Sequence, residues 1–452
     1  MTKDELNRID VTEAIDGAPV GRFQVLVFAL CAAIAMIDGF DTQAIAFVAP
    51  AISEQWKVSP AAFGSVFGVG LAGLAVGAFV LSPLADRFGR RLMLLACALI
   101  FGGFALLTAR CDGLTQLLVL RFVTGIGLGG AMPSIIALTS EYAPSRARAT
   151  SVTIMFCGFP LGAFLGGFLA AYLIPAYGWR SVFLVGGCVP LAFAAVLWVA
   201  MPESIRFLAR RGNSGPELAR LLNRIVPGAR YRGDENFILP EEKFSKFPVR
   251  YLFTDGRAGL TLLVWTAFFA NLMVMYFLFN WMPTLFKQEG LPIATAIKST
   301  AIMNLGGVVG AIVLGRLIDR IGAVRALSFA YLGAAVFLAV ISGVDRSNAQ
   351  ILLPAVFMAG FGIAGAQIGM NALTAEVYPT AIRSTGVGWA LGVGRIGSII
   401  GPIVGGGLLA LEWSTSLIFS LTIAPMLVAA LAVFSLGLNS QTRASQPVRV
   451  PS

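Results

Sequence analysis

The stretch GIGLGGAMPSIIALTSEYAPSRARAT, residues 125–150, occurs a second time as GFGIAGAQIGMNALTAEVYPTAIRST, residues 360–385. The two copies align without a gap, and about 11 of the 26 positions are identical. The matching positions include Gly125 with Gly360, Gly130 with Gly365, Thr139 with Thr374, Glu141 with Glu376, Pro144 with Pro379 and Arg148 with Arg383. A second matching pair is LADRFG at 84–89 and LIDRIG at 317–322. The chain is therefore expected to consist of two repeated halves.

Long apolar runs fill both halves. Of the 452 residues, 57% are hydrophobic and 12% are charged, which is about half the charged fraction of an average soluble domain. Each run approaches the ~20 residues that a helix needs to cross a bilayer, whereas a membrane β-barrel would show short alternating segments. We predict an all-α polytopic membrane protein with twelve transmembrane helices. The predicted spans are 23–49, 61–83, 91–109, 114–138, 150–173, 181–201, 258–283, 296–318, 324–343, 350–376, 383–410 and 414–437.

Lysine and arginine are distributed unevenly over the loops that join these runs. If both termini are cytoplasmic, the cytoplasmic segments hold roughly 25 of the 33 Lys and Arg residues and the outer loops about six, as the positive-inside rule expects. This orientation explains the net charge of +10 without a nucleic-acid partner. The first apolar run is too long for a signal peptide, so none is expected. The predicted organisation is a cytoplasmic segment at 1–22, a six-helix half at 23–201, a cytoplasmic loop at 202–257, a second six-helix half at 258–437 and a cytoplasmic tail at 438–452.

Several enzyme motifs are absent or misplaced. G-x-G-x-x-G occurs in both copies, but inside apolar helical runs, where glycines serve close helix packing rather than dinucleotide binding. The chain has no histidine, and its five cysteines are scattered, so a metal centre is not expected.

Repeated halves of this kind are typical of transporters that rock about a central site at the interface. A nucleotide-binding P-loop is also missing. We therefore predict a transporter rather than an enzyme, with no cofactor and an ion gradient as its energy source.

Two carboxylates lie in the middle of the first apolar run, in AMIDGFDTQA at 35–44. A charge at the centre of a lipid-facing helix costs roughly 2.5–3.5 kcal/mol, so Asp38 and Asp41 must have a use. Their spacing of three residues places them on one helix face. Buried carboxylates that repel each other can bind and release protons near neutral pH. We predict a proton-coupling site at Asp38 and Asp41, in a cavity shared with Arg395.

Two arginines also lie within apolar runs. Arg395 lies close to the middle of its predicted span, and the aligned first-half residue is Pro160, so this charge is not part of the repeated scaffold. Its planar guanidinium suits a carboxylate ligand, and we predict that it binds a substrate anion; the alternative is a structural ion pair with an aspartate of the first span. Arg121, near the start of the fourth span, either has a functional partner or extends to the membrane surface.

The segment SPLADRFGRRLML, at 82–94, and the segment MPESIRFLARRG, at 201–212, resemble two signatures of the major facilitator superfamily. Ser82 replaces the leading glycine of the first signature, and the second copy has Ala323 and Val324 where the arginine pair belongs. The resemblance implies that this loop switches conformation. It also implies that Arg121 and Glu141 belong to the proton-coupling network. The implied switch residues are Asp86, Arg87, Gly89, Arg90, Asp319, Arg320 and Arg383.

The motif DGFD and the segment NLMVMYFLFNWMPTLF, at 271–286, resemble the aromatic acid:proton symporters of that superfamily. The matching residues of the segment are Asn271, Tyr276, Phe277 and Trp281. Aromatic side chains can form an apolar slot for a ring, although aromatic residues in a span also serve as lipid-facing belts. Further polar residues that could hydrogen-bond a ring hydroxyl are Asn304, Gln367 and Asn371.

From these features we expect a proton-coupled symporter that imports an aromatic carboxylate, such as 3- or 4-hydroxybenzoate, across a bacterial inner membrane. Its partners would be the substrate, protons and the lipid bilayer, and the chain would act as a monomer without nucleic acid. The alternatives are another organic anion (muconate, a phthalate or an aryloxyacid), a drug or sugar transporter of the same fold, or a receptor or channel. The sequence leaves open which aspartate carries the proton.

Overall fold

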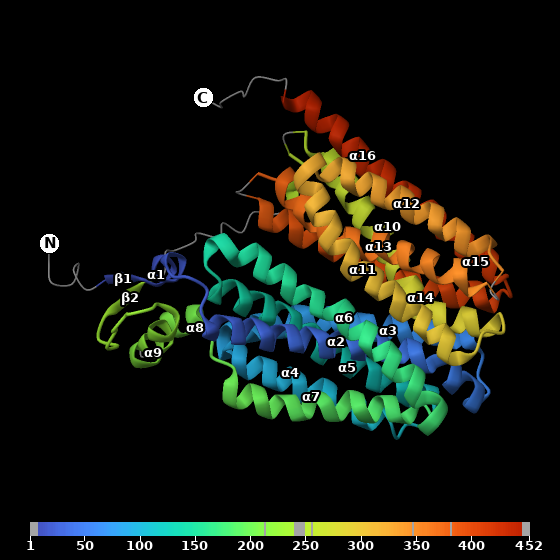
Figure 1. Cartoon of the computed structure of the whole chain (residues 1–452), viewed down its shortest axis with the longest axis horizontal. Helices are drawn as coiled ribbons and strands as arrows, with labels where there is room; N and C mark the ends of the chain where they lie inside the picture. The colour runs from blue at the N-terminus through green and yellow to red at the C-terminus, as the bar shows by residue number, and fades with distance from the viewer. Residues whose placement is uncertain are drawn as a thin grey trace. The chain divides into compact units, whose positions relative to one another are not determined.

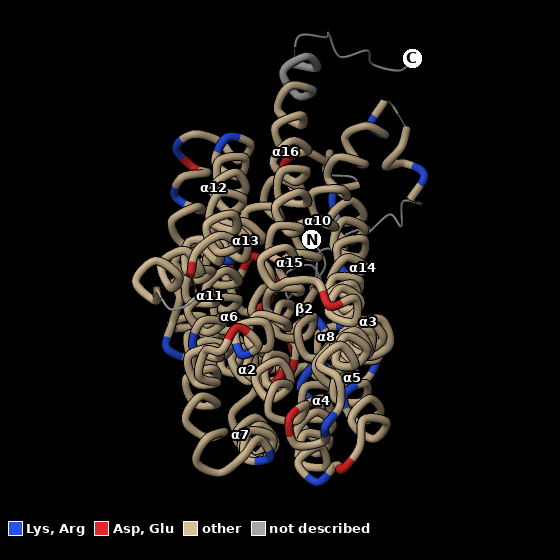
Figure 2. The backbone as a smooth tube through the Cα atoms, turned by 90° about the vertical axis from the view of Figure 1, so that its right-hand side faces the viewer, with Lys and Arg blue, Asp and Glu red and all other residues tan. Residues whose placement is uncertain are grey.

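The computed structural model describes residues 8–211, 214–238, 249–254, 256–345, 348–379 and 382–444. The predicted tail beyond residue 444 and the part of the predicted central loop at 239–248 lie outside these residues. Within the described part, twelve helical spans are long and apolar enough to cross a membrane, so the predicted all-α polytopic fold is confirmed. Figure 2 shows long stretches of these helices without a charged residue.

The spans are formed by thirteen helices, because the last span is divided. They are α2 (Arg22–Trp56), α3 (Phe63–Phe88), α4 (Arg90–Thr108), α5 (Leu114–Tyr142), α6 (Ser145–Tyr177), α7 (Arg180–Ala200), α10 (Ala258–Gln288), α11 (Ile293–Ile321), α12 (Ala323–Gly343), α13 (Ala349–Val377), α14 (Arg383–Ala410), α15 (Thr415–Leu421) and α16 (Ile423–Ala444). Several helices run past the predicted spans, since a helix can continue into polar residues beyond the apolar run; α2 ends at Trp56 rather than at 49. Thr422 separates α15 from α16, and its hydroxyl donates to the Phe419 carbonyl at 2.6 Å.

Short elements complete the chain. They are β1 (Arg8–Asp10), α1 (Val11–Gly17), η1 (Pro60–Ala62), α8 (Ile205–Arg210), α9 (Gly215–Ile225), β2 (Asn236–Ile238) and η2 (Val249–Leu252). The strands β1 and β2 pair in parallel, with Arg8 opposite Asn236 and Asp10 opposite Ile238. Figure 1 shows β1, α1, α8, α9 and β2 gathered together beside one end of α2. The elements β1 and α1 of the N-terminal segment and α8, α9 and β2 of the central loop therefore form one small structure.

Contacts divide the chain into two compact units. Unit 1 comprises Met1–Thr42, Gly70–Gly162 and Arg180–Phe244, and unit 2 comprises Gln43–Val69, Ala163–Trp179 and Ser245–Ser452. The helices α2, α3 and α6 contribute one end to each unit.

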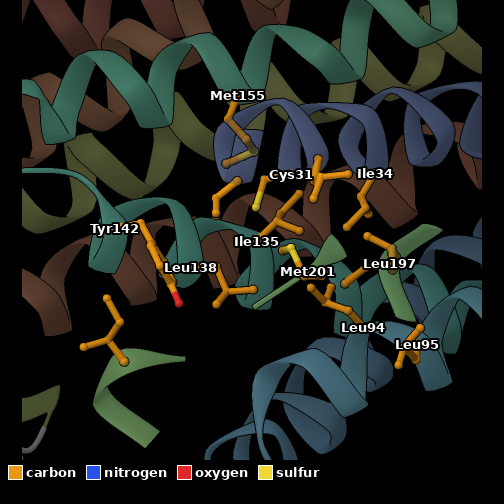
Figure 3. Close-up of a cluster of buried hydrophobic side chains, with 14 of the residues drawn as sticks. Cys31, Ile34, Leu94, Leu95, Ile135, Leu138, Tyr142, Met155, Leu197 and Met201 are labelled. Carbon is orange, nitrogen blue, oxygen red and sulfur yellow. The ribbon is translucent and has the colours of Figure 1, made fainter. Parts of the chain in front are cut away.

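The core of unit 1 is an apolar cluster to which all the helices from α1 to α9 and the segment after α7 contribute. Figure 3 labels Cys31, Ile34, Leu94, Leu95, Ile135, Leu138, Tyr142, Met155, Leu197 and Met201 from this cluster. Glycines let α5 approach its neighbours closely: a Cβ at Gly127 would lie 2.8 Å from the backbone nitrogen of Phe101, and one at Gly130 would lie 2.6 Å from Leu81. In unit 2, a Cβ at Gly365 would lie 2.7 Å from Gly310. The prediction that the G-x-G-x-x-G motifs serve helix packing is confirmed.

Candidate functional site

Asp41 of α2 and Arg121 of α5 form a buried ion pair in unit 1. Arg121 Nη2 lies 3.2 Å from Asp41 Oδ2 and also donates to the Asp41 carbonyl at 3.1 Å. The Asp41 side chain is 0% exposed and the Arg121 side chain is 4% exposed. Arg121 therefore points into the protein rather than toward the membrane surface. Three polar atoms of the pair, Asp41 Oδ1 and the Nε and Nη1 of Arg121, have no hydrogen-bond partner among the described residues.

Asp38 lies one turn earlier on α2 and is also buried. Its Oδ1 accepts a hydrogen bond from Thr42 Oγ1 at 3.0 Å. The DGFD motif requires a glycine at its second position, because a Cβ at Gly39 would collide with the backbone of Phe159 on α6. The motif thus combines two carboxylates with a close approach of α2 to α6.

Arg395 of α14 lies in unit 2 beside Tyr276 of α10. Its Nη1 donates to the Tyr276 hydroxyl at 3.5 Å, and its side chain is half-buried. Among the described residues of its own unit, no carboxylate forms an ion pair with Arg395. The Arg395 guanidinium therefore lies inside a transmembrane helix and donates to the phenol of Tyr276. Because a guanidinium has five N–H donors, Arg395 retains donors that could bind an anion.

Amide side chains lie on three helices of the same unit. Asn271 Nδ2 of α10 donates to Gln367 Oε1 of α13 at 2.7 Å, and this joins two predicted binding residues. Asn304 Nδ2 of α11 donates to the Thr300 carbonyl at 3.0 Å, within its own helix. The Oδ1 atoms of Asn271, Asn304 and Asn371 are buried without a hydrogen-bond partner among the described residues. They are acceptors that a hydroxyl group could satisfy, because a buried unpaired acceptor costs about 1–3 kcal/mol.

A charged network surrounds the loop between α3 and α4 in unit 1. Arg90 contacts Asp86 at 3.3 Å and Glu141 of α5 at 3.2 Å. Glu141 in turn accepts from Ser204 Oγ at 2.6 Å and from the backbone nitrogen of Arg206 at 3.4 Å. The structure therefore brings Glu141 together with the predicted switch residues Asp86 and Arg90, and among the described residues neither Asp41 nor Arg121 forms an ion pair with it.

Glu203 supplies a cap that α4 lacks locally. The residue before α4 is Gly89, with a φ of +99° and no side chain to accept a hydrogen bond. Glu203 Oε1 instead accepts from the backbone nitrogens of Arg90 at 2.7 Å and Arg91 at 3.1 Å. A Cβ at Gly89 would lie 2.5 Å from Glu203 Oε2, so the loop requires glycine for both conformation and space.

Comparison with known proteins agrees with this arrangement. The sequence profile of the family described as Major Facilitator Superfamily matches residues 31–344 and 299–451 of the chain. The chain belongs to the major facilitator superfamily. It is thus a multi-pass membrane transporter, and the prediction that it is not an enzyme is confirmed by this membership.

Two similar members of the superfamily carry functional names. The chain is 40% identical over 441 residues to the 4-hydroxybenzoate transporter PcaK of Acinetobacter baylyi, covering 97% of this chain and 96% of that protein. It is 41% identical over 449 residues to the gallate transporter of Pseudomonas putida, covering 98% of each chain. The solved D-xylose-proton symporter matches the fold with a TM-score of 0.69 at 17% identity, over 91% of this chain and 97% of that one.

The second superfamily loop, between α11 and α12, differs from the first in its contacts. Asp319 and Arg320 are exposed and form no ion pair among the described residues. Gly322, with a φ of +88°, precedes α12, and no side chain caps this end among the described residues. Arg383 opens α14 and is exposed, and Arg87 of the first loop lies over the Phe88 ring at 5.5 Å.

Trp281 has packing contacts in unit 2. Its indole Nε1 donates to the Pro402 carbonyl of α14 at 2.8 Å, and its ring meets Phe67 edge to face with 5.1 Å between centroids. Gly405 leaves space for the indole. Because the N–H group is already used, a substrate contact of Trp281 would have to be made through the ring face, and the predicted binding role stays a prediction.

Sequence reasoning missed two residues that the structure places in these networks. The sequence signature at 201–212 contains Glu203 without indicating that it caps a helix; the signal for this role is the lack of a capping residue before Arg90, since α4 then needs a distant acceptor. The second residue is Tyr142, whose hydroxyl donates to the Glu203 carbonyl at 2.7 Å. A buried tyrosine at the end of an apolar helix was the available signal.

Proposed function

We propose that the chain is a proton-coupled symporter that imports an aromatic carboxylate of the hydroxybenzoate class. The observation that carries this proposal is Arg395, a guanidinium within a transmembrane helix that has no carboxylate partner among the described residues of its own unit. A substrate carboxylate would satisfy this guanidinium through two parallel hydrogen bonds. The similarity to the 4-hydroxybenzoate and gallate transporters supports an aromatic ring as the rest of the substrate.

The ring substituents would be recognised by the amide groups of unit 2. A ring hydroxyl is both a donor and an acceptor, and the unpaired Oδ1 atoms of Asn271, Asn304 and Asn371 would accept a hydrogen bond from it. Tyr276 would contribute an aromatic wall and a hydroxyl next to Arg395. A site that hydrogen-bonds a substrate hydroxyl discriminates strongly against analogues without it, because the buried acceptors are then left unpaired.

The proton would be carried by the carboxylate of Asp41, which is paired with Arg121, and Asp38 would be the second carboxylate. Protonation of Asp41 removes the negative charge that Arg121 contacts at 3.2 Å, so the ion pair is broken and remade in each cycle. An anion that enters a cell against 100 mV, inside negative, loses about 2.3 kcal/mol. One proton cancels this charge, and a second makes uptake voltage-driven. We further propose an inner-membrane location with both termini cytoplasmic and a monomeric transporter.

The test is uptake of labelled 4-hydroxybenzoate by purified protein in proteoliposomes. An imposed pH gradient, alkaline inside, should drive accumulation above equilibrium, and 3-hydroxybenzoate or gallate should compete better than muconate, phthalate or xylose. A potassium diffusion potential imposed separately would reveal whether more than one proton enters per anion. Uptake that is equal with and without a gradient would exclude coupling and favour a channel. Competition by muconate alone would change the substrate class but leave the coupling intact.

A further inference from the structure

The helix α6 begins without a local cap. The residue before its first residue, Ser145, is Pro144, whose carbonyl accepts from the backbone nitrogen of Ala147 at 2.9 Å, as expected at an N-cap position. Proline has no side-chain oxygen that could accept a hydrogen bond from the free N–H groups of the first turn. The start of α6 therefore needs an acceptor from elsewhere in the chain.

Asp16 of α1 supplies this acceptor. Its Oδ1 accepts from the backbone nitrogen of Ser145 at 2.7 Å and lies 3.9 Å from Arg148 Nη2. Arg146 closes the contact from the other side, because its guanidinium donates to the carbonyls of Asp16 at 3.4 Å and Ala18 at 2.8 Å. A carboxylate at this position also complements the positive end of the helix dipole.

The segment that carries Asp16 is itself held in place. Asp10 caps α1 by accepting from the backbone nitrogens of Thr12 at 2.8 Å and Glu13 at 3.1 Å. Val11 and Ile15 are buried in the apolar cluster of unit 1, which also contains Leu222 of α9. The pairing of β1 with β2 fixes the segment from its other end. Asp16 is thus presented to α6 by a folded element with several anchors.

We propose that Asp16 is a positioning residue of the transport cycle, which fixes the start of α6 and the short connection between α5 and α6. The other side of this connection carries Glu141, which binds Arg90 and Ser204. Asp16 does for α6 what Glu203 does for α4, so two neighbouring helix starts of unit 1 depend on distant carboxylates. Loss of Asp16 releases the first turn of α6, which slows the conformational change while leaving the substrate-binding residues untouched.

The experiment uses the full chain in proteoliposomes and compares Asp16→Ala with Asp16→Asn and with Glu13→Ala. Asp16→Ala should lower the maximal rate of 4-hydroxybenzoate counterflow several-fold, with the KM unchanged within twofold. It should also speed hydrogen exchange at the amides of Ala147 and Arg148. Asparagine keeps the accepting oxygen and should restore most of the rate. Glu13 is exposed on the same helix, so Glu13→Ala should behave as wild type. The exchange measurement needs no substrate and is independent of the proposed function.

A second variant keeps the test decisive if Asp16→Ala fails to reach the membrane. In Asp16→Ala/Pro144→Ser, serine at the N-cap position provides a local acceptor for the same turn. This double variant should recover the amount of protein in the membrane, the transport rate and the slow exchange. The proposal is overturned if the double variant recovers none of these, or if Asp16→Ala matches Glu13→Ala in both rate and exchange.

Discussion

Arg121 and Arg395 are two arginines within transmembrane helices, one in each unit, and they differ in how their charge is compensated. Arg121 is buried against Asp41, which neutralises it within the protein. Arg395 is half-buried and contacts a tyrosine hydroxyl, and the part of its unit that the structure describes offers it no carboxylate partner. A guanidinium away from water needs an anion. The comparison therefore teaches that Arg121 has its anion within the protein, whereas the proposed anion of Arg395 is the substrate carboxylate.

The internal repeat sharpens this difference. The glycines that pack α5 and α13 recur in both copies, whereas the position aligned with Arg395 is Pro160. Helix packing is therefore shared between the halves, whereas the charge of Arg395 is not. Substitutions at the two arginines should accordingly separate substrate binding from coupling, and four predictions follow this difference from the largest expected effect to the smallest.

The largest effect on substrate affinity is expected at Arg395. Arg395→Ala should weaken binding of 4-hydroxybenzoate by about 10- to 100-fold, because a hydrogen-bonded charge contributes about 1.5–3 kcal/mol. Arg395→Lys keeps the charge but loses the two-point geometry, so it should lie between wild type and alanine. Calorimetry on purified protein measures both. If the methyl ester of the substrate competes as well as the acid, the carboxylate is read elsewhere.

The second prediction concerns Asp41. Asp41→Asn should abolish accumulation against a gradient, while counterflow survives better because it needs no net proton movement. The variant also leaves Arg121 without its anion, which costs about 3–5 kcal/mol for a buried pair. Asp41→Asn/Arg121→Gln should therefore be more stable in thermal unfolding than Asp41→Asn alone. Asp38→Asn is the matched comparison on the same helix, and wild-type accumulation in both single variants would disprove coupling through this pair.

A smaller effect is expected from the cap of α4. Glu203→Ala removes the acceptor of two backbone N–H groups, and the loss of a helix cap costs about 1 kcal/mol. The transport rate should fall several-fold with substrate affinity unchanged. Glu217→Ala, at an exposed position of α9, is the control. A loss of affinity in calorimetry, rather than of rate, would show that Glu203 acts on the binding site.

The smallest effects are expected at the loop aspartates. The Asp86 side chain is 63% exposed, and exposed ion pairs contribute about 0–1 kcal/mol, so Asp86→Asn should slow transport only moderately. Asp319→Asn should change the rate even less, because Asp319 has no ion-pair partner among the described residues. Initial uptake rates measure both. An equal and large loss in the two variants would mean that both loops switch in the same way.

The fold could be predicted from the sequence because the length and apolar composition of a segment are enough to identify a membrane-spanning helix. Asp41, Arg121 and Arg395 were also recognisable, since an ionisable residue within an apolar run is costly and needs a reason. Their partners were harder to predict. The pairing of Arg121 with Asp41 rather than Asp38 depends on which face of α2 meets α5, and the spacing of the aspartates does not give that face.

The capping residues were not predictable by local rules. Helix caps are normally read from the residue that precedes the helix. In α4 and α6 that residue is Gly89 or Pro144, and the acceptor comes from Glu203 or Asp16, far away in the chain. A missing cap indicates that an acceptor is needed, but only the three-dimensional structure shows which carboxylate provides it.

The parallel pairing of β1 with β2 has a consequence for biosynthesis. Arg8 leaves the ribosome early, yet its partner Asn236 is made on the order of 200 residues later, after the six spans of the first half. At 5–20 residues per second, the first strand waits for roughly tens of seconds before it can pair. The N-terminal strand therefore pairs with β2 only after the six spans of the first half have been synthesised and inserted into the membrane. A nascent chain arrested before residue 236 should carry an N-terminus that remains open to proteases.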